Sequence, residues 1–214
     1  MDSPLWIYLL GLSAQLFYVG RVLVQWYLSE KHHKVESPSL FWIFSMAGSV
    51  ILFCYGYLRQ DLSIIFGEFL SYYIYMWNIG IKGLYKKCLK LLVWAQGLFP
   101  VLIISLMLKD LPQFTATFLR NSYMPAALLA FGTLGQFVYK MRFVYQIIYS
   151  VRRKESVLPL GYWLMAVSGS LMIICYGVIR HDWVLIAGQV GIVASIRNMM
   201  IYFSSQKAND EKAV

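Results

Sequence analysis

The sequence CYGYLRQDLSIIFGE at residues 54–68 returns as CYGVIRHDWVLIAGQ at residues 175–189. Extending this match outward at the same offset of 121 pairs residues 11–68 with residues 132–189 without a gap, with 17 identities in 58 positions. Chance similarity between apolar segments would repeat Leu and Val, whereas this match also keeps Gln, Arg, Trp and the Arg-x-Asp triplet. The chain is therefore a duplicated unit.

The composition is that of a membrane protein. Hydrophobic residues make up 59% of the 214 residues and charged residues only 14%, against roughly a quarter charged residues in a typical soluble domain. Seven apolar runs come close to the ~20 residues that cross a bilayer, at residues 5–28, 40–58, 62–81, 89–108, 125–149, 160–179 and 184–203. We expect the first run to stay in the mature protein, because no basic segment precedes it and it is too long for a signal peptide.

The repeat organises these runs as three helices, one linking helix and three more helices. We divide the chain into a first repeat (residues 1–81), a linker with helix four (82–121), a second repeat (122–204) and a cytoplasmic tail (205–214). One linking helix returns the chain to its starting side, so the repeats should be parallel and related by an axis along the membrane normal. The sequence predicts an all-α, seven-helix, SWEET-like 3+1+3 fold.

The basic residues of the connections predict the orientation, because cytoplasmic loops collect Lys and Arg. With the N-terminus outside and the C-terminus inside, only Arg59, Lys109, Arg120 and Arg180 lie outside. Most of the net charge of +9 then forms a cytoplasmic fringe facing anionic headgroups rather than a nucleic-acid surface. The inside collects eleven residues: Lys31, Lys34, Lys82, Lys86, Lys87, Lys90, Arg152, Arg153, Lys154, Lys207 and Lys212.

The sequence contains no pattern typical of a soluble active site. It has no Ser-His-Asp arrangement, Gly-rich phosphate loop, paired carboxylates or metal-spaced His and Cys cluster, so we expect no cofactor. Cys54 and Cys175 occupy equivalent positions in the second helix of each repeat. We expect them to be small buried hydrophobic residues.

Polar residues inside the first helix of each repeat are the strongest functional signal. Gln15, Tyr18, Arg21 and Gln25 fall within about a third of a turn of each other at ~100° per residue. The second repeat keeps this stripe as Gln136, Tyr139, Arg142 and Gln146. Because a polar face toward lipid leaves donors unsatisfied, both stripes should face protein or water. We expect them to line a common central axis.

The depth of the arginines indicates an anionic ligand. At ~1.5 Å per residue, Arg21 and Arg142 lie about 24 to 26 Å from the outer helix ends, Arg197 about 20 Å and Glu68 about 9 Å. Guanidinium groups without carboxylates at their depth favour a phosphate, which suits the planar fork of Arg. Alternatively, the arginines extend to the inner interface or bind backbone carbonyls. Lys140 points away from Arg142 and should extend to the interface.

Other repeated residues are interpreted as structural, both in the first copy and 121 positions later. Pro38 opens the second helix, and Trp42 is expected in the aromatic belt at the membrane interface. Gly48 should let helices approach closely. Asp61 should cap the third helix next to Arg59, although the Arg-x-Asp triplet could instead form a gate that contacts a ligand.

These residues resemble a known family, the N-terminal domain of lipid-A-disaccharide synthases, within the wider group of PQ-loop and SWEET-like membrane proteins. The resemblance implies a bacterial inner-membrane location, a role in lipid A or lipid-linked sugar metabolism, and membrane lipids as partners. In the first copy it rests on Arg21-Val22-Leu23-Val24-Gln25-Trp26, Pro38, Phe41-Trp42, Arg59-x-Asp61, Gly67 and Asn78. In the second copy it rests on Arg142, Gln146, Pro159, Trp163, Arg180-x-Asp182, Gly188-Gln189 and Arg197-Asn198.

The chain departs from these patterns in three ways. Ala14-Gln15 and Gly135-Gln136 stand where the Pro-Gln dipeptide of the PQ-loop group is expected, and Glu68 replaces the Gln found at Gln189. The glycosyltransferase body that names the family is not among these 214 residues, so we expect no glycosyl transfer. The candidate ligand-contacting residues are Arg21, Arg142, Arg197, Gln15, Gln136, Gln25, Gln146, Tyr18, Tyr139, Glu68, Asn78 and Asn198.

Three functions fit the sequence. The first is a protein that binds and translocates a phosphate-bearing glycolipid or polyprenyl-phosphate sugar. The second is a SWEET-like transporter of small sugars, which rests on the helix layout alone. The third is a non-catalytic membrane subunit that positions a separate glycosyltransferase. The arginines favour the first function, because a path for neutral sugars has no use for guanidinium groups.

Overall fold

The computed structural model describes residues 4–32, 38–119, 125–153, 159–193, 195–197 and 199–200. The regular elements among these residues are helices. The chain forms two compact units, Met1–Thr133 and Leu134–Val214, and the division between them falls within helix α6 (Ala126–Arg153).

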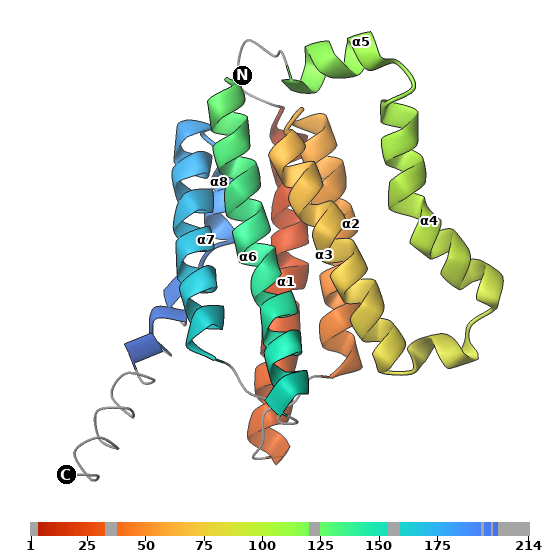
Figure 1. Ribbon diagram of the computed structural model, residues 1–214, viewed down its shortest axis with the longest axis vertical. Helices are drawn as coiled ribbons and strands as arrows, with labels where there is room; N and C mark the ends of the chain where they lie inside the picture. The colour runs from red at the N-terminus through yellow and green to blue at the C-terminus, as the bar shows by residue number, and fades with distance from the viewer. Residues whose placement is uncertain are drawn as a thin grey trace. The chain divides into compact units, whose positions relative to one another are not determined.

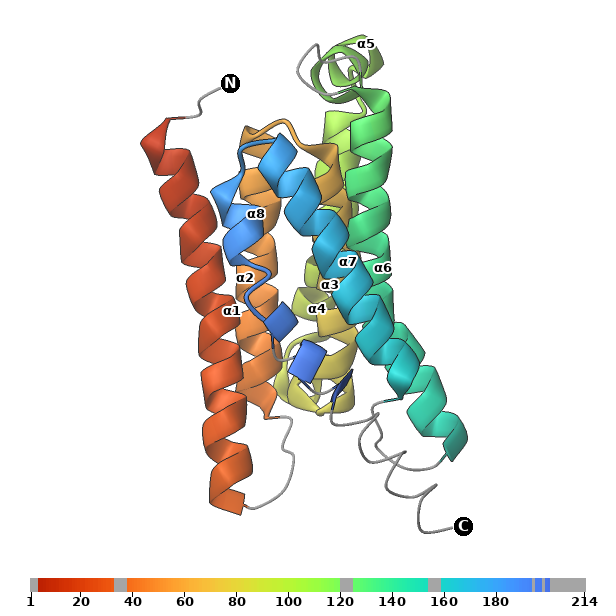
Figure 2. The ribbon, with the colours of Figure 1, turned by 90° about the vertical axis from the view of Figure 1, so that its left-hand side faces the viewer.

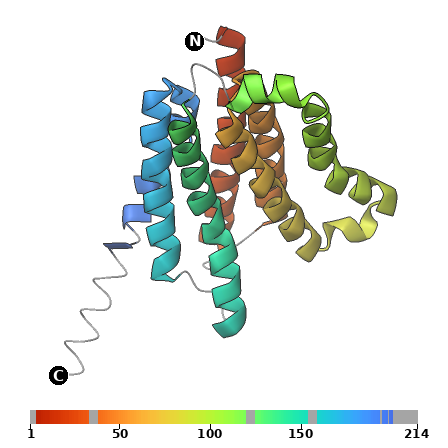
Figure 3. The ribbon, with the colours of Figure 1, turned by 45° about the horizontal axis from the view of Figure 1, so that its top comes forward.

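The first unit is built on three long helices that lie side by side. These are α1 (Leu5–His32), α2 (Ser39–Leu58) and α3 (Leu62–Ile81), with α2 in contact with both others (Figures 1 and 2). After the short 3-10 helix η1 (Leu84–Lys87), α4 (Lys90–Met107) runs back in the opposite direction to α3. The chain then turns into the short helix α5 (Leu111–Phe114) and the π-helical η2 (Thr115–Leu119), as Figure 3 shows.

The turn between α2 and α3 explains how the repeated triplet Arg-x-Asp acts. Gln60 adopts the left-handed conformation (φ 53°), and the amides of Gln60 and Asp61 donate to the carbonyls of Tyr57 and Gly56 at 3.0 and 2.9 Å. This pair of bonds is a Schellman motif, which satisfies carbonyls at the end of α2. The Asp61 carboxyl then accepts from the amide of Ser63 at 3.0 Å, so it caps α3.

The second copy forms the same turn. His181 has φ 50°, and the amide of Asp182 donates to the carbonyl of Gly177 at 2.7 Å. The Asp182 carboxyl accepts from the amide of Leu185 at 3.2 Å. The predicted capping role of both aspartates is therefore confirmed, and residues that differ between the copies build the same backbone geometry.

The predicted glycine contacts and helix starts are confirmed in both copies. A Cβ on Gly48 would lie 3.1 Å from Cε1 of Tyr18, and one on Gly169 would lie 2.7 Å from the backbone nitrogen of Tyr139. Each glycine therefore lets the second helix of its repeat press against the tyrosine of the first. Pro38 and Pro159 directly precede α2 and α7 (Leu160–Ile179).

A proline lies inside α4, and two tyrosines on α3 donate hydrogen bonds to α4 carbonyls near it. Pro100 has no N–H to donate to the carbonyl of Gln96, and its ring pushes that carbonyl away. The hydroxyl of Tyr72 donates to the Gln96 carbonyl at 2.9 Å, and that of Tyr73 donates to the carbonyl of Gly97 at 2.9 Å. Tyr72 thus replaces the intrahelical bond that Pro100 cannot make, which lets a proline stay inside an apolar helix.

Four of the described helices are long and apolar enough to cross a membrane, in α1, α2, α4 and α7. Helices α3 and α6, with 20 and 28 residues, have sufficient length but are not among these four. The described residues therefore form an all-helical structure with four helices suited to a membrane. The seven-span 3+1+3 arrangement, the parallel relation of the repeats and their boundaries stay predictions.

In the second unit, α6 packs against α7 (Figures 1 and 3), and the expected last helix is interrupted. Helix α8 (Trp183–Ala187) ends early, turns occupy residues 188–191, and short helical stretches follow among the described residues. Gly191 stands where the first repeat has Leu70, and glycine weakens a helix interior by about 1 kcal/mol relative to alanine. The depth expected for Arg197 assumed a continuous helix, so it does not apply.

Two further expectations are wrong because they assumed a different inward-facing side for the second helix of a repeat. Trp42 is only 9% exposed and packs on Phe41 and Tyr75, with ring centroids 4.9 and 6.2 Å away, so it is a core residue and not part of an interface belt. Cys54 and Cys175 are exposed rather than buried. Cys54 lies nine residues from buried Ser45, which at ~100° per residue is the opposite face of α2.

Candidate functional site

Arg21 is held inside the first three-helix unit. Its Nη1 donates to Oγ of Ser45 on α2 at 2.9 Å and to the hydroxyl of Tyr75 on α3 at 3.2 Å. Its guanidinium carbon lies 4.7 Å from the ring centroid of Tyr18 and 5.0 Å from that of Phe41. Hydroxyl oxygens thus accept from the guanidinium while aromatic faces pack on it.

Tyr18 connects this arginine to the buried acid of α3. Its hydroxyl donates to Oε2 of Glu68 at 2.8 Å, and Glu68 is only 2% exposed. The backbone carbonyl of Glu68 accepts from Oγ of Ser49 on α2 at 3.1 Å. The structure therefore brings together three of the predicted site residues, Tyr18, Arg21 and Glu68, in one network within the first unit.

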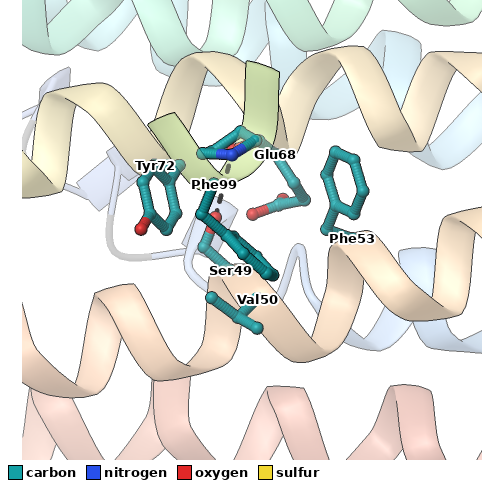
Figure 4. A pocket seen from close by; sticks show the side chains of 7 residues that line it. Ser49, Val50, Phe53, Glu68, Tyr72 and Phe99 are labelled. Carbon is teal, nitrogen blue, oxygen red and sulfur yellow. Dashed lines mark hydrogen bonds between the residues drawn. The ribbon is translucent and has the colours of Figure 1, made fainter. Parts of the chain in front are cut away.

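A narrow pocket lies beside Glu68 at the proline of α4. Figure 4 shows Glu68 among Phe53, Phe99 and Tyr72. The space open to the centre of a water molecule is about 10 Å³, room for about one water. The pocket is lined by Ser49, Val50, Phe53, Glu68, Tyr72, Phe99 and Pro100.

Arg142 in the second unit has different surroundings. It is 7% exposed, and its guanidinium carbon lies 3.6 Å from the ring centroid of Tyr139, 4.8 Å from that of Phe143 and 5.6 Å from that of Tyr162. Its Nε is buried and has no hydrogen-bond partner among the described residues. The guanidinium is therefore stacked on aromatic rings, with a buried donor that no described residue satisfies.

Neighbouring polar side chains in the second unit are also buried. Lys140 is 7% exposed with its Nζ 5.9 Å from the ring centroid of Tyr139, so the expectation that it extends to the membrane interface is wrong. Gln136 is 5% exposed. Oε1 of Gln189 accepts from Oγ of Ser170 at 2.9 Å. Two cationic side chains therefore share the ring of Tyr139.

Other predicted site residues lie outside these two groups of contacts. The amide of Asn78 donates to the carbonyl of Ile74 in its own helix at 2.8 Å, and Arg197 is exposed. Gln15, Gln25 and Gln146 are half-buried. The predicted Asn198 and the cytoplasmic tail lie outside the described residues, and a common central axis of both stripes stays a prediction.

A cavity of about 370 Å³, which was not predicted from the sequence, lies at the end of the first unit where α2, α4 and α5 meet. This volume falls in the range of small-molecule sites, ~300 to 1,000 Å³. One local signal was available, because Asp110 before Leu111-Pro112 marks a helix start, and Asp110 caps α5 by accepting from the amide of Gln113 at 3.0 Å. The cavity is lined by Tyr57, Leu58, Gln60, Leu106, Met107, Asp110, Gln113, Phe114, Thr117 and Phe118.

Comparison with known families identifies the repeated unit. Residues 10–80 and again residues 131–200 match the family described as Lipid A Biosynthesis N-terminal domain. The chain belongs to this family. The two matched segments begin 121 residues apart, which agrees with the internal repeat, and they confirm the resemblance to the N-terminal domain of lipid-A-disaccharide synthases.

Known relatives are considerably longer than this chain. It is similar to a lipid-A-disaccharide synthase of Chlamydia abortus, with 26% identity over 220 residues, 95% of this chain and 34% of the relative. It is also similar to one of Chlamydia trachomatis serovar D, with 27% identity over 208 residues, 92% of this chain and 34% of the relative. The chain thus spans about a third of the length of these relatives. No solved structure matches it.

Proposed function

We propose that this chain is a multi-pass inner-membrane protein of lipid A metabolism that binds a phosphate-bearing glycolipid, moves it between the leaflets, and forms no glycosidic bond itself. The observation that carries the proposal is Arg142. It is permanently charged, 7% exposed, stacked on aromatic rings, and has a buried Nε that no described residue accepts from.

The geometry of arginine suits this role. The faces of a guanidinium stack on aromatic rings, while its five N–H donors lie in the plane of the group. Stacking on Tyr139 therefore leaves the in-plane donors for oxygen atoms. A buried donor without an acceptor costs about 1–3 kcal/mol. A phosphate, which accepts two parallel N–H bonds, would relieve this cost.

The membrane setting supports a lipid as the source of the phosphate. Arg142 lies on α6, and the candidate membrane spans α4 and α7 precede and follow this helix in the chain. The family is described as Lipid A Biosynthesis N-terminal domain. The relatives are named lipid-A-disaccharide synthases. A lipid can reach a buried cation from the bilayer with its phosphate already attached, whereas a neutral sugar offers the guanidinium no charge.

Ligand-dependent stabilisation tests the proposal. Purified protein in phosphatidylcholine nanodiscs is heated with a glucosamine-based glycolipid carrying one phosphate monoester, with the same lipid lacking phosphate, or with glucose. Only the phosphorylated lipid should raise Tm, by about 2.7 kcal/mol of stabilisation at a hundredfold excess over Kd. A Tm raised by glucose and unmoved by the phosphorylated lipid would favour small-sugar transport and refute the proposal.

Movement between leaflets needs a separate measurement. In proteoliposomes, a fluorescent version of the phosphorylated lipid placed in both leaflets is bleached from outside with dithionite. Dithionite first bleaches the lipid of the outer leaflet. With active protein, a second phase of bleaching should follow as lipid moves out from the inner leaflet, and Arg142→Gln should slow this second phase. A second phase equal to that of protein-free liposomes would reduce the function to binding alone.

A second candidate function is favoured by the lengths of the relatives. The chain covers about a third of lipid-A-disaccharide synthases, so this domain occurs together with a larger remainder in those proteins. The unit could position a separate glycosyltransferase at the membrane. Crosslinking in cells, followed by purification through a tag, should then recover a glycosyltransferase in fixed ratio, and recovery of the chain alone would reject this function.

A further inference from the structure

The cavity where α2, α4 and α5 meet has one charged residue in its wall. Of its ten lining residues, nine are uncharged and Asp110 is an acid. The neighbouring Lys109 is exposed and does not line the cavity. The wall therefore carries a formal charge of −1 in a chain whose net charge is +9. Because a carboxylate attracts a cation and repels a phosphate, this cavity suits a different ligand from Arg142.

Asp110 can cap a helix and bind a ligand at the same time. Its Oδ1 accepts from the amide of Gln113 at 3.0 Å, which caps α5. An ionised carboxylate has two oxygens with about four acceptor sites, so one bond from the backbone uses only part of this capacity. The Asp110 side chain is also exposed. It can therefore accept from the ammonium group of a bound molecule without giving up its cap.

Aromatic rings form another part of the wall. Phe118 is 5% exposed and belongs to a core cluster with Phe53 and Ile65. The ring centroids of Phe114 and Tyr57 lie 5.2 and 6.1 Å from that of Phe118. Phe118 thus anchors two more exposed rings to the core of the first unit. Aromatic faces attract cations, and rings beside a carboxylate favour an organic ammonium ion.

The remaining polar groups and the place of the cavity define the ligand further. Gln60, Gln113 and Thr117 add amide and hydroxyl groups to the wall, which can donate to and accept from polar substituents of a ligand. The cavity lies where the candidate spans Ser39–Leu58 and Lys90–Met107 end. A site at this level is within reach of both water-soluble molecules and lipid headgroups.

We propose that this cavity binds the ammonium group of a polar organic amine. Asp110 is the counter-ion, the rings of Tyr57 and Phe114 pack on the cation, and Gln113 bonds a polar substituent of the ligand. The site shares no residue with the surroundings of Arg142 and takes the opposite charge, so it goes beyond the proposed function. The amine has two available sources, a free amino sugar and the headgroup of an amine-bearing lipid.

Calorimetric titration of the full-length protein tests the class of ligand. The protein is held in phosphatidylglycerol nanodiscs, whose lipids carry no amine, at a pH below the pKa of the glucosamine amine. Glucosamine and glucose are matched probes, because they differ by an ammonium in place of one hydroxyl. Glucosamine should bind about tenfold more tightly, from a cation–π contact together with an ion pair. Equal Kd values, or no binding of glucosamine, would overturn the proposal.

Substitutions in the wall test the two parts of the site. Asp110→Asn removes the charge and keeps an oxygen for the cap, since Asn caps helices as well as Asp does. It should raise the Kd of glucosamine about tenfold and leave Tm without ligand close to that of the wild type. Tyr57→Leu removes a ring that Tyr57→Phe keeps, so it should bind glucosamine about threefold more weakly than Tyr57→Phe. A wild-type Kd in Asp110→Asn, or equal Kd values in the two Tyr57 variants, would refute the site.

A further comparison separates this site from the proposed function. Arg142→Gln should leave the Kd of glucosamine unchanged. Asp110→Asn should leave binding of the phosphorylated glycolipid unchanged when the amine of that lipid is acylated, because an amide carries no ammonium. Loss of glucosamine binding in a folded Arg142→Gln variant would overturn the existence of a separate site.

Phosphatidylethanolamine distinguishes the two sources of the amine. It is added to the phosphatidylglycerol nanodiscs, and the titration with glucosamine is repeated. A raised apparent Kd of glucosamine would support an ammonium site that a lipid headgroup fills. An unchanged Kd would support an ammonium site for a free amine.

Discussion

The hydroxyl of Tyr18 on α1 donates a 2.8 Å hydrogen bond to the carboxyl of Glu68 on α3, two residues that are 50 positions apart in the chain. Helix α2 contacts both α1 and α3. The hydrogen bond from Tyr18 to Glu68 therefore links the two helices that pack on α2. The same tyrosine ring packs on the guanidinium of Arg21. The Tyr18 side chain thus contacts both the buried Glu68 and the half-buried Arg21.

Removing this hydroxyl should destabilise the first unit. Tyr18→Phe takes a donor from a carboxyl that is 2% exposed, and losing a bond to a buried charged group costs about 1–3 kcal/mol. Unfolding by SDS in mixed micelles measures the change. Tyr57→Phe is the control, since Tyr57 is 50% exposed and its hydroxyl should contribute little. Equal losses in the two variants would show that the bond to Glu68 does not contribute.

The tyrosines on α3 and the proline of α4 should be energetically coupled. Pro100→Ala returns an N–H that can bind the carbonyl of Gln96, which now accepts from Tyr72. Tyr72→Phe should cost about 0.5–1.5 kcal/mol in the wild type and clearly less beside Pro100→Ala. A double-mutant cycle on unfolding free energies measures this coupling. A coupling energy near zero would mean that Tyr72 does not replace the bond removed by the proline.

Two glycines of the second unit should respond to alanine in opposite ways. A Cβ on Gly191 would meet no atom within 4 Å, so Gly191→Ala should raise helicity and stabilise the unit by up to about 1 kcal/mol. A Cβ on Gly169 would lie 2.7 Å from the backbone nitrogen of Tyr139, so Gly169→Ala must force α6 and α7 apart and destabilise the unit. Circular dichroism and thermal unfolding give both signs, and a stabilising Gly169→Ala would contradict the packing of these helices.

The predicted orientation can be tested by cysteine labelling. Cys54, Cys88 and Cys175 are all exposed, so a cysteine-free background is required before single cysteines are introduced. Replacements of Lys86 and Arg153 should react only after the membrane is permeabilised, and replacements of Arg59 and Lys109 should react in intact cells. Labelling of Lys86 and Arg59 positions from the same side would contradict the seven-span topology.

Much of the local structure was predictable from the sequence, because it depends on short-range chemistry. Asp61 and Asp182 cap helices through amides two or three residues away, and Pro38 and Pro159 start helices with their own fixed φ. The interruption after α8 was missed because the expectation weighed the apolar run at residues 184–203 more than Gly191 within it. A single glycine interrupts a helix only where tertiary packing does not support that helix.

The sequence by itself determined the duplication, the apolar helices, the capped turns and the family, all of which follow from spacing, composition and residue order. Only the tertiary structure decided which groups surround each arginine, since Ser45 and Tyr75 lie 24 and 54 residues from Arg21. It also decided that Trp42 is in the core and that Lys140 is buried. The reason is physical: a helix that is apolar on every side gives no hydrophobic stripe to show which face turns inward. Its rotation, and therefore the partner of each buried charge, depends on how the helices pack.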